Sequence, residues 1–276
     1  MTCFICTTCG TQHADSPQPP ERCAICTDAR QYVGREGQRW TTLDQLRRDH
    51  RNRIQGLEPA LTGIGTEPSF AIGQRALLVE TPEGNLLWDC VSLLDDATVA
   101  AVRARGGVAA IAVSHPHYYS SMVEWSRAFE APVYLHRADR DWVMRPDPCI
   151  RFWSGETLPL FGGITLIRCG GHFPGATVAH WPAGAEGKGA LLAGDVLQVV
   201  QDRRYVSFMF SYPNLIPLPA RIVERIARTV AAYEFDRIYG AWWDRVVDRD
   251  GRAAVARSAA RYAAAVRSRA RELRHL

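Results

Sequence analysis

The chain has 276 residues, of which 47% are hydrophobic and 22% are charged, and its formal net charge is +4. These values are ordinary for a globular protein. No run of residues approaches the roughly 20 apolar residues that a membrane-spanning helix needs, so no such helix is expected. The length allows one large domain plus a small appendage.

The first predicted element is a small zinc ribbon in residues 1–40. Two cysteine pairs follow the pattern C-x2-C-x13-C-x2-C, which is typical of a tetrahedral zinc site with the ligands Cys6, Cys9, Cys23 and Cys26. Cys3 also precedes Cys6 by three residues. Gly10 nevertheless favours the pair Cys6 and Cys9, because a knuckle turn needs a residue that tolerates positive φ. Iron in place of zinc stays an alternative.

Residues 41–66 are expected to form a helix and a linker. Thr42 and Gln45 fit a capping box that opens a polar helix to about Ile54, and a Gly- and Pro-containing linker follows over 58–68. Residues 76–80 and 85–88 have the pattern of a β-hairpin. Further helices are expected over 95–103, over 121–129, where Ser121 and Glu124 fit a second capping box, and over 219–233.

Four apolar runs, each typical of a buried strand, are followed by polar or aromatic residues. His115 and His117 follow the first run, His172 the second, Asp195 the third, and Trp242 with Trp243 the fourth. Residues at the ends of neighbouring strands converge although they are far apart in sequence. Histidine and carboxylate ligands suit a borderline-soft divalent metal such as zinc.

These motifs resemble those of the metallo-β-lactamase fold superfamily. The resemblance covers roughly residues 67–276 and implies an αββα sandwich. It includes His115-Pro116-His117, Gly170-Gly171-His172 and Gly194-Asp195. The first motif of that superfamily is His-x-His-x-Asp-His, but here Tyr119 stands at the aspartate position and Ser120 at the last histidine position. The last metal histidine of the superfamily would fall near Trp242 or Trp243.

The resemblance implies one complete metal site made by His115, His117, His172 and Asp195, and a second site that keeps only Asp195. We therefore expect at most one metal in the core, zinc or alternatively iron. The predicted function is hydrolysis of an ester, thioester, lactone, amide or phosphoester by a single zinc-activated water. Asp195 would ligate the metal or act as general base, and Tyr118 would stabilise the oxyanion.

The remaining predicted site residues would surround this centre. Asp89 would support the metal loop from behind, Tyr119 and Ser120 would fill the space of the second metal, and Trp242 and Trp243 would wall the pocket for a small-molecule substrate. A non-catalytic metal- or small-molecule-binding protein on the same fold stays an alternative. Nucleic-acid processing is less favoured, because a two-metal nuclease needs the second ligand set. Eight cysteines without a disulfide pattern favour the cytoplasm.

Overall fold

A computed structural model describes residues 1–267 of the chain, which divide into two compact units, Met1–Ser154 and the part that begins at Gly155. Both units mix sheets with helices. Part of the arginine-rich C-terminal segment lies outside the described residues. None of the helices within residues 1–267 is both long enough and apolar enough to cross a membrane.

The first unit begins with a three-stranded antiparallel sheet in the order β2-β1-β3. Its elements are β1 (Thr2–Cys6), β2 (Gln12–Ser16), the short helix α1 (Ala24–Thr27) and β3 (Trp40–Thr42). Ile5 packs with Leu46 and Leu93, which lie outside the ribbon, while Ile25 packs with the buried cysteines. The apolar core of this small sheet therefore depends on neighbouring parts of the unit.

A seven-stranded sheet forms the centre of the first unit, in the order β10-β9-β8-β7-β6-β5-β4. The strands are β4 (Arg51–Glu58), β5 (Leu61–Glu67), β6 (Arg75–Val79), β7 (Leu86–Trp88), β8 (Ala110–Ala112), β9 (Val133–His136) and β10 (Ile150–Trp153). Strands β4 to β7 pair antiparallel, whereas β7 to β10 pair parallel. Carboxyl ends of β7, β8 and β9 therefore meet at one edge of the sheet.

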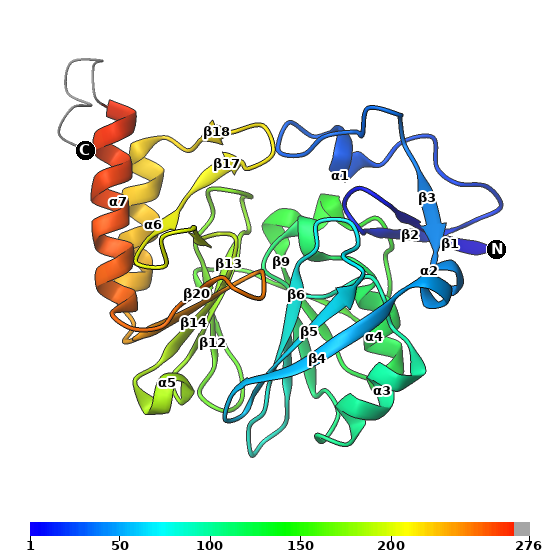
Figure 1. The fold of residues 1–276 in the computed structure, drawn as a ribbon, viewed down its shortest axis with the longest axis horizontal. Helices are drawn as coiled ribbons and strands as arrows, with labels where there is room; N and C mark the ends of the chain where they lie inside the picture. Colours follow the sequence, from blue (N-terminus) through cyan, green and yellow to red (C-terminus); the bar gives the residue numbers. More distant parts are fainter. Residues whose placement is uncertain (268–276) are drawn as a thin grey trace. The chain divides into compact units, whose positions relative to one another are not determined.

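Helices connect the parallel strands of this sheet. These helices are α3 (Asp96–Arg103) and α4 (Met122–Phe129). Helix α2 (Leu43–Asp49) lies nearer the N-terminus, and the unit also contains two 3-10 turns, η1 (Pro116–Tyr118) and η2 (Arg137–Trp142). Crossovers between parallel strands are right-handed, so α3 and α4 lie on the same face of the sheet (Figure 1). The α3 and α4 segments agree with the predicted helices, and α3 is capped by Asp95, whose side chain accepts from the Thr98 N–H.

The second unit contains a six-stranded sheet in the order β11-β12-β13-β14-β19-β20. The strands are β11 (Thr157–Pro159), β12 (Thr165–Arg168), β13 (Thr177–Trp181), β14 (Ala190–Gly194), β19 (Arg237–Gly240) and β20 (Val246–Val247). Only β14 and β19 pair parallel among these strands. Two small hairpins follow β14, made by β15 (Gln198–Val199) with β16 (Val206–Ser207) and by β17 (Met209–Ser211) with β18 (Ile216–Pro217).

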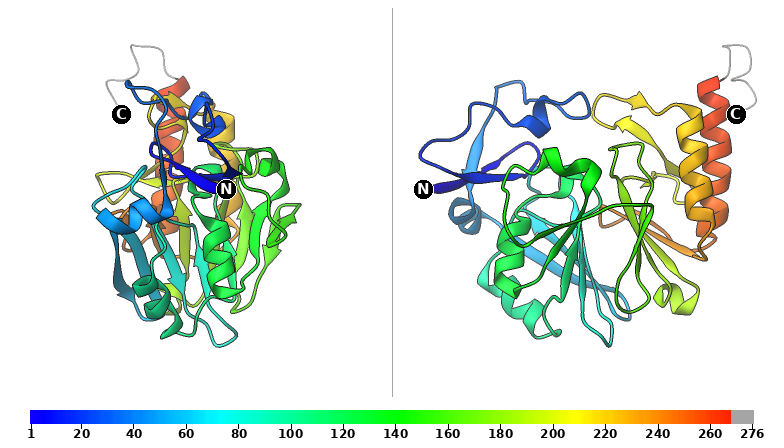
Figure 2. Two further views of the ribbon diagram at one scale, coloured as in Figure 1. Left: turned by 90° about the vertical axis from the view of Figure 1, so that its right-hand side faces the viewer. Right: turned by 180° about the vertical axis from the view of Figure 1, so that it is seen from behind.

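Helices α6 (Ala220–Ala231) and α7 (Gly251–Arg267) lie side by side in the second unit (Figures 1 and 2), and the short helix α5 (Gly184–Gly187) precedes β14. The hydroxyl of Tyr262 on α7 accepts from the Leu218 N–H at 2.7 Å, just before α6. Arg267 and Glu224 form an ion pair between the two helices at 2.7 Å. The predicted helix over 219–233 is confirmed.

Two sequence predictions for the first unit were wrong. The predicted linker over 58–68 is largely strand β5, and the helix predicted to reach Ile54 ends at Asp49, where β4 follows. Strands β4 and β5 pair from Arg51 with Glu67 onward, which stabilises both segments through contacts that are not local in sequence. The Thr42 capping box itself is confirmed, because Thr42 accepts from the Gln45 N–H and Gln45 from the Thr42 N–H.

The prediction of a second capping box at Ser121 was also wrong, although helix α4 begins where it was predicted to begin. Ser121 is the N-cap residue but makes no side-chain cap hydrogen bond. Its hydroxyl contacts the carbonyl oxygens of Val91 and Ser92 at 3.1 and 2.8 Å instead. Tertiary partners have therefore replaced the local hydrogen bond at this helix start.

Candidate metal centres

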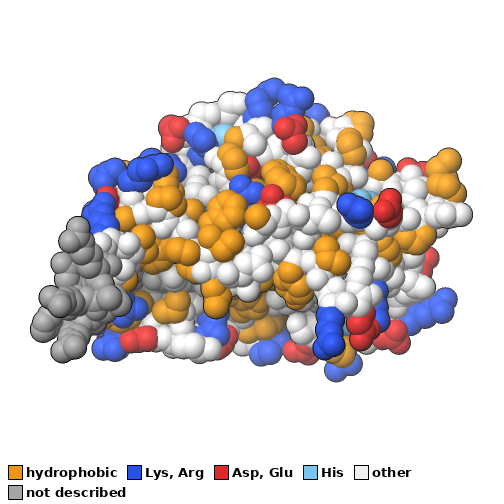
Figure 3. All heavy atoms as spheres, turned by 90° about the horizontal axis from the view of Figure 1, so that it is seen from above, with side chains coloured by type: hydrophobic (Ala, Val, Ile, Leu, Met, Phe, Trp, Pro, Cys, Tyr) orange, Lys and Arg blue, Asp and Glu red, His pale blue; other side chains and the backbone are white. Residues whose placement is uncertain are grey.

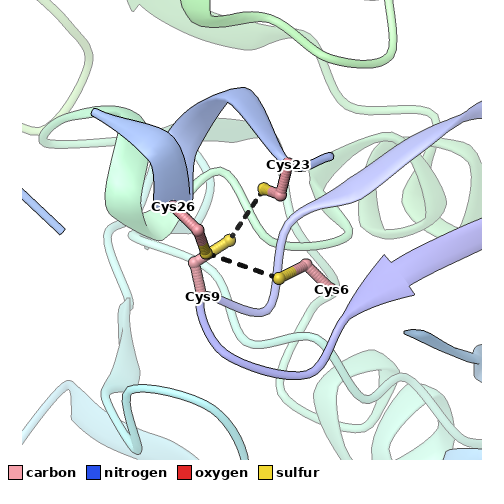
Figure 4. A group of neighbouring side chains, drawn as sticks. All are labelled: Cys6, Cys9, Cys23 and Cys26. Carbon is pink, nitrogen blue, oxygen red and sulfur yellow. Dashed lines mark hydrogen bonds between the residues drawn. The ribbon is translucent and has the colours of Figure 1, made fainter. Parts of the chain in front are cut away.

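The four predicted ribbon cysteines lie together in the first unit, and their side chains point toward one another (Figure 4). The Sγ atoms of Cys6 and Cys26 are 3.5 Å apart, those of Cys9 and Cys23 are 3.6 Å apart, and all four lie within 4.8 Å of one another. All four side chains are buried. Cys3 is partly exposed and is not a member of this group, as the position of Gly10 predicted.

Local structure explains why the cysteines converge. Gly10 has a φ of +81°, and its N–H donates to the carbonyl of Cys6 at 2.9 Å, which closes the first knuckle. Cys23 is the N-cap residue of α1, so Cys26 lies one turn later on the same helix. The amide of Gln38 donates to the Cys6 Sγ at 3.1 Å, as is typical of a hydrogen bond that orients a ligand sulfur.

The geometry of the cysteine group fits a tetrahedral metal. A disulfide needs sulfur atoms about 2.05 Å apart, and the eight cysteines are all free thiols. A tetrahedron with zinc–sulfur bonds of about 2.3 Å has edges of roughly 3.8 Å, which is close to the observed separations. Hydrogen bonds from Cys26 and Cys6 lower the pKa of Cys23, whereas burial raises the pKa of Cys9. The four sulfur atoms therefore provide a suitable donor set for zinc, with iron as the alternative.

The His115–His117 segment lies directly after β8 in the first unit. Both imidazoles are buried, and their ring centroids are 5.1 Å apart. The 3-10 turn η1 orders the segment, because the Tyr118 N–H donates to the His115 carbonyl at 3.1 Å. Ser114 Oγ lies 2.9 Å from His115 Nδ1, so His115 directs its Nε2 away from that contact. A pair of histidines held in this way suits a divalent metal.

Asp89 holds the start of this histidine loop. Its carboxylate accepts a hydrogen bond of 2.7 Å from the N–H of Ser114, which is the residue before His115. Asp89 is buried and has a φ of +61°, a conformation that Asn and Asp tolerate better than other non-glycine residues. The predicted role of Asp89 in supporting a metal site stays a prediction.

We expect Asp89→Ala to lower the free energy of unfolding by about 1–3 kcal/mol, because it leaves the buried Ser114 N–H without this acceptor. Asp89→Asn is the matched control, since it keeps an oxygen acceptor and tolerates positive φ. Urea unfolding of the two variants measures the difference. Equal losses in both variants would attribute the effect to the charge of Asp89 instead of its hydrogen bond.

Protein groups surround the positions where the metal ligands of the superfamily are replaced. The Ser120 hydroxyl donates to the Cys90 carbonyl at 3.2 Å and accepts from Gln74 Nε2 at 3.0 Å. The Tyr119 hydroxyl donates to the carbonyl of Asp139 at 3.4 Å, and burial raises the pKa of Tyr119 well above its usual range. The Tyr118 ring is fully buried and lies 4.5 Å from the His115 ring.

In the second unit, His172 and Asp195 are both buried. His172 Nδ1 lies 3.1 Å from the carbonyl oxygen of Met209. Tyr212 adjoins both site residues, because its ring is 5.7 Å from the His172 ring and its hydroxyl donates to the Asp195 carbonyl at 2.8 Å. Burial raises the pKa of Tyr212 well above its usual range.

Two neighbours of these residues were not predicted as metal ligands or catalytic residues. Met209 contacts His172 through its backbone carbonyl, which no side-chain motif can reveal. In the sequence, Tyr212 is recognisable only as part of an aromatic segment, and nothing there indicates its contact with Asp195. Trp242 and Trp243 lie between β19 and β20 and are partly exposed. Their predicted role as pocket walls stays a prediction.

Comparison with known proteins supports the fold and the family. No family model matches the chain. The fold is similar to the crystal structure of the DIM-1 metallo-beta-lactamase, with 15% identity, a TM-score of 0.59 and coverage of 78% of this chain and 98% of that chain. It is also similar to the metallo-beta-lactamase FIM-1 from Pseudomonas aeruginosa in its mono-zinc form, with 13% identity, a TM-score of 0.56 and coverage of 77% and 96%. The predicted metallo-β-lactamase fold class is thereby confirmed.

A closer similarity extends over almost the whole sequence. The uncharacterized protein YmaE of Bacillus subtilis (strain 168) is 51% identical over 270 residues, which is 97% of this chain and 98% of that protein. The matched region therefore includes both the cysteine ribbon and the histidine segments. At this identity and coverage, the chain belongs to the same protein family as YmaE.

Proposed function

We propose that the protein is a metal-dependent hydrolase whose core site holds one zinc ion. The histidines His115, His117 and His172 would supply three ligands, with Asp195 or water as the fourth. The metallo-β-lactamase fold and the order of these residues along the chain support this proposal. The substrate would be a small molecule with an ester, thioester, lactone, amide or phosphoester bond.

The contact between His172 Nδ1 and the Met209 carbonyl oxygen is the observation that supports the proposal most strongly. A carbonyl oxygen can only accept a hydrogen bond, so the Nδ1 atom of His172, 3.1 Å away, must carry the proton. In the neutral imidazole the lone pair is then on Nε2, which can bind a metal. Metal-binding histidines usually donate their other ring N–H to a carbonyl or carboxylate in this way.

The remaining site residues have chemical roles in this proposal. The neutral imidazoles of His115, His117 and His172 would hold a zinc ion, which would supply an attacking water with its pKa lowered to about 7. Asp195 would accept the proton of the attacking water as general base if it does not ligate the metal. The Tyr118 hydroxyl would donate a hydrogen bond to the oxyanion that develops on the substrate.

One metal is favoured over two because of the replacements at Tyr119 and Ser120. The Ser120 hydroxyl is engaged by Cys90 and Gln74, and a phenol with a raised pKa is a poor ligand at neutral pH. The tryptophans at 242 and 243 have an indole N–H, which is only a donor. The mono-zinc form of FIM-1 gives a precedent for one zinc in a protein of this fold.

Crystals of the full chain, soaked with zinc and measured for anomalous scattering, test this proposal together with an assay panel of the named substrate classes. We expect one peak at the cysteines, one at the core histidines and hydrolysis in at least one class. Two full core peaks about 3.5–4 Å apart would contradict the single-metal site. An empty core with the histidines bonded to protein groups would favour a non-catalytic binding protein.

Nucleic-acid processing remains the weaker alternative. The face drawn in Figure 3 carries arginine side chains interspersed with acidic and apolar ones, whereas binding to a phosphate backbone favours a continuous basic surface. We also propose that the protein acts in the cytoplasm, because all eight cysteines are free thiols.

A further inference from the structure

Direct hydrogen bonds connect the cysteine ribbon to the loop that carries His115 and His117, within the first unit. The N–H of Gln12 donates to the carbonyl of Ser120 at 3.0 Å, and the hydroxyl of Ser92 donates to the carbonyl of Gly10 at 2.7 Å. Gly10 follows the ligand Cys9 directly, and Ser120 lies three residues after His117. The first contact therefore joins the ribbon directly to the histidine loop, and the second joins it to residues 90–92.

The contact at Gly10 leaves no space for a side chain at this position of the first knuckle. A Cβ atom added at Gly10 would lie 2.5 Å from the Ser92 Oγ and 3.2 Å from the Ala71 Cβ. Since real Cβ atoms do not come as close as 2.5 Å, only glycine allows the knuckle backbone to pack this tightly. The position of the knuckle is thus determined by the same residues that hold the histidine loop.

The side chain of Gln12 forms a second connection, to the start of α4. Its Nε2 donates to Glu124 Oε1 at 3.3 Å, and the guanidinium of Arg145 contacts both Gln12 and Glu124. The side chains of Arg145 and Glu124 are only 10% and 27% exposed, so the ion pair is well shielded from water. A shielded hydrogen-bonded pair is costly to break from one side.

Residues 90–92 also hold the loop through hydrogen bonds. Ser120 bonds to the Cys90 carbonyl, Ser121 to the Val91 and Ser92 carbonyls, and Trp125 Nε1 to the Val91 carbonyl at 3.0 Å. Ser92 belongs to this layer and also bonds to Gly10. Loss of the ribbon would therefore remove the Gln12 partner of the Ser120 carbonyl and the Gly10 partner of the Ser92 hydroxyl.

We propose that the cysteine ribbon is a positioning element for the His115–His117 loop, so that metal in the ribbon increases the metal affinity of the core site. The affinity part of this inference rests on the proposed function. The ribbon depends on its metal for folding, because its segment buries few large apolar residues. Without metal in the ribbon, Gly10 and Gln12 move away from the His115–His117 loop. The backbone hydrogen bonds of the loop then open more often.

Hydrogen exchange of residues 114–122 in the full chain tests this inference. In Cys23→Ser, which removes one ribbon ligand, we expect exchange in this loop to be about tenfold faster or more, while β5 and β6 keep their protection. The double variant Gln12→Ala/Ser92→Ala keeps all four cysteines and the backbone contact of residue 12, but it removes the side-chain contacts of Gln12 with Glu124 and Arg145 and of Ser92 with Gly10. It should therefore also speed exchange in the loop, with the ribbon metal retained. Ser16→Ala is the matched control, because the Ser16 hydroxyl donates to the nearby Gln18 carbonyl at 2.6 Å and not to the loop.

Core metal affinity provides the second measurement. We expect the double variant to weaken core zinc binding by about 10- to 100-fold, as is typical when groups that support metal ligands are removed. The exchange experiment is repeated in variants that also carry His172→Ala and therefore lack a proposed ligand of the core metal. An effect on the loop in this background does not depend on a core metal. Unchanged exchange over 114–122 in Cys23→Ser, while the ribbon segment of the same variant loses protection, would overturn the inference whether or not the core binds zinc.

Discussion

Replacement of His172 by alanine is expected to remove the core metal and to lower kcat/KM by about 10³-fold or more, with the fold intact. The metal contributes several kcal/mol of transition-state stabilisation, and each 1.36 kcal/mol corresponds to a factor of ten in rate. Elemental analysis and steady-state kinetics on the best substrate of the panel measure the two effects. Far-UV circular dichroism reports whether the fold is retained.

His180→Ala is the matched control for this experiment. His180 is also a buried histidine of the second unit, and its Nε2 lies 2.7 Å from the carbonyl of Glu234. It lies within β13, not at a strand end, so its loss should reduce stability without reducing metal content. Retention of the core metal by His172→Ala, or an equal loss of metal in both variants, would contradict the assignment of His172 as a ligand.

Replacement of Cys23 by serine is expected to remove one equivalent of metal and to unfold the ribbon sheet made by β1, β2 and β3. Structural zinc sites in small peptides have apparent binding free energies of about 10–16 kcal/mol, and this free energy becomes folding free energy in a segment with a small apolar core. Elemental analysis under reducing conditions also identifies the metal as zinc or iron. Limited proteolysis of residues 1–42 reports unfolding.

Cys3→Ser is the matched control for the ribbon. Cys3 lies on β1 but outside the group of four, and burial raises the pKa of its thiol. We expect Cys3→Ser to retain the full metal content. The same metal content in Cys23→Ser as in the wild type would show that the cysteine group does not hold the metal.

The sequence alone predicted the elements whose signals are local. Apolar runs located β12, β14 and β19, and helix patterns located α3, α4 and α6, because side-chain periodicity reflects which face an element buries. Cysteine spacing predicted the four ribbon sulfurs that lie together, since a knuckle is a short turn whose geometry depends on its own residues. The Thr42 capping box is likewise a contact between residues three apart.

Tertiary structure alone decided the features that depend on distant partners. Strand β5 contains Gly63 and Gly65 and has little strand signal of its own, yet it pairs with both β4 and β6 in the sheet. The Ser121 hydroxyl contacts carbonyls about 30 residues away instead of capping its own helix.

The ribbon's contact with the histidine loop, from Gln12 to Ser120, joins residues more than 100 positions apart. The Met209 carbonyl, which determines the tautomer of His172, is also distant from it in the sequence, by 37 positions. Backbone groups carry no identity in the sequence, and a contact of long separation forms only when the whole sheet places its two partners together. For this reason the residue types of the candidate centres could be predicted from sequence, whereas the groups that hold them in place could not.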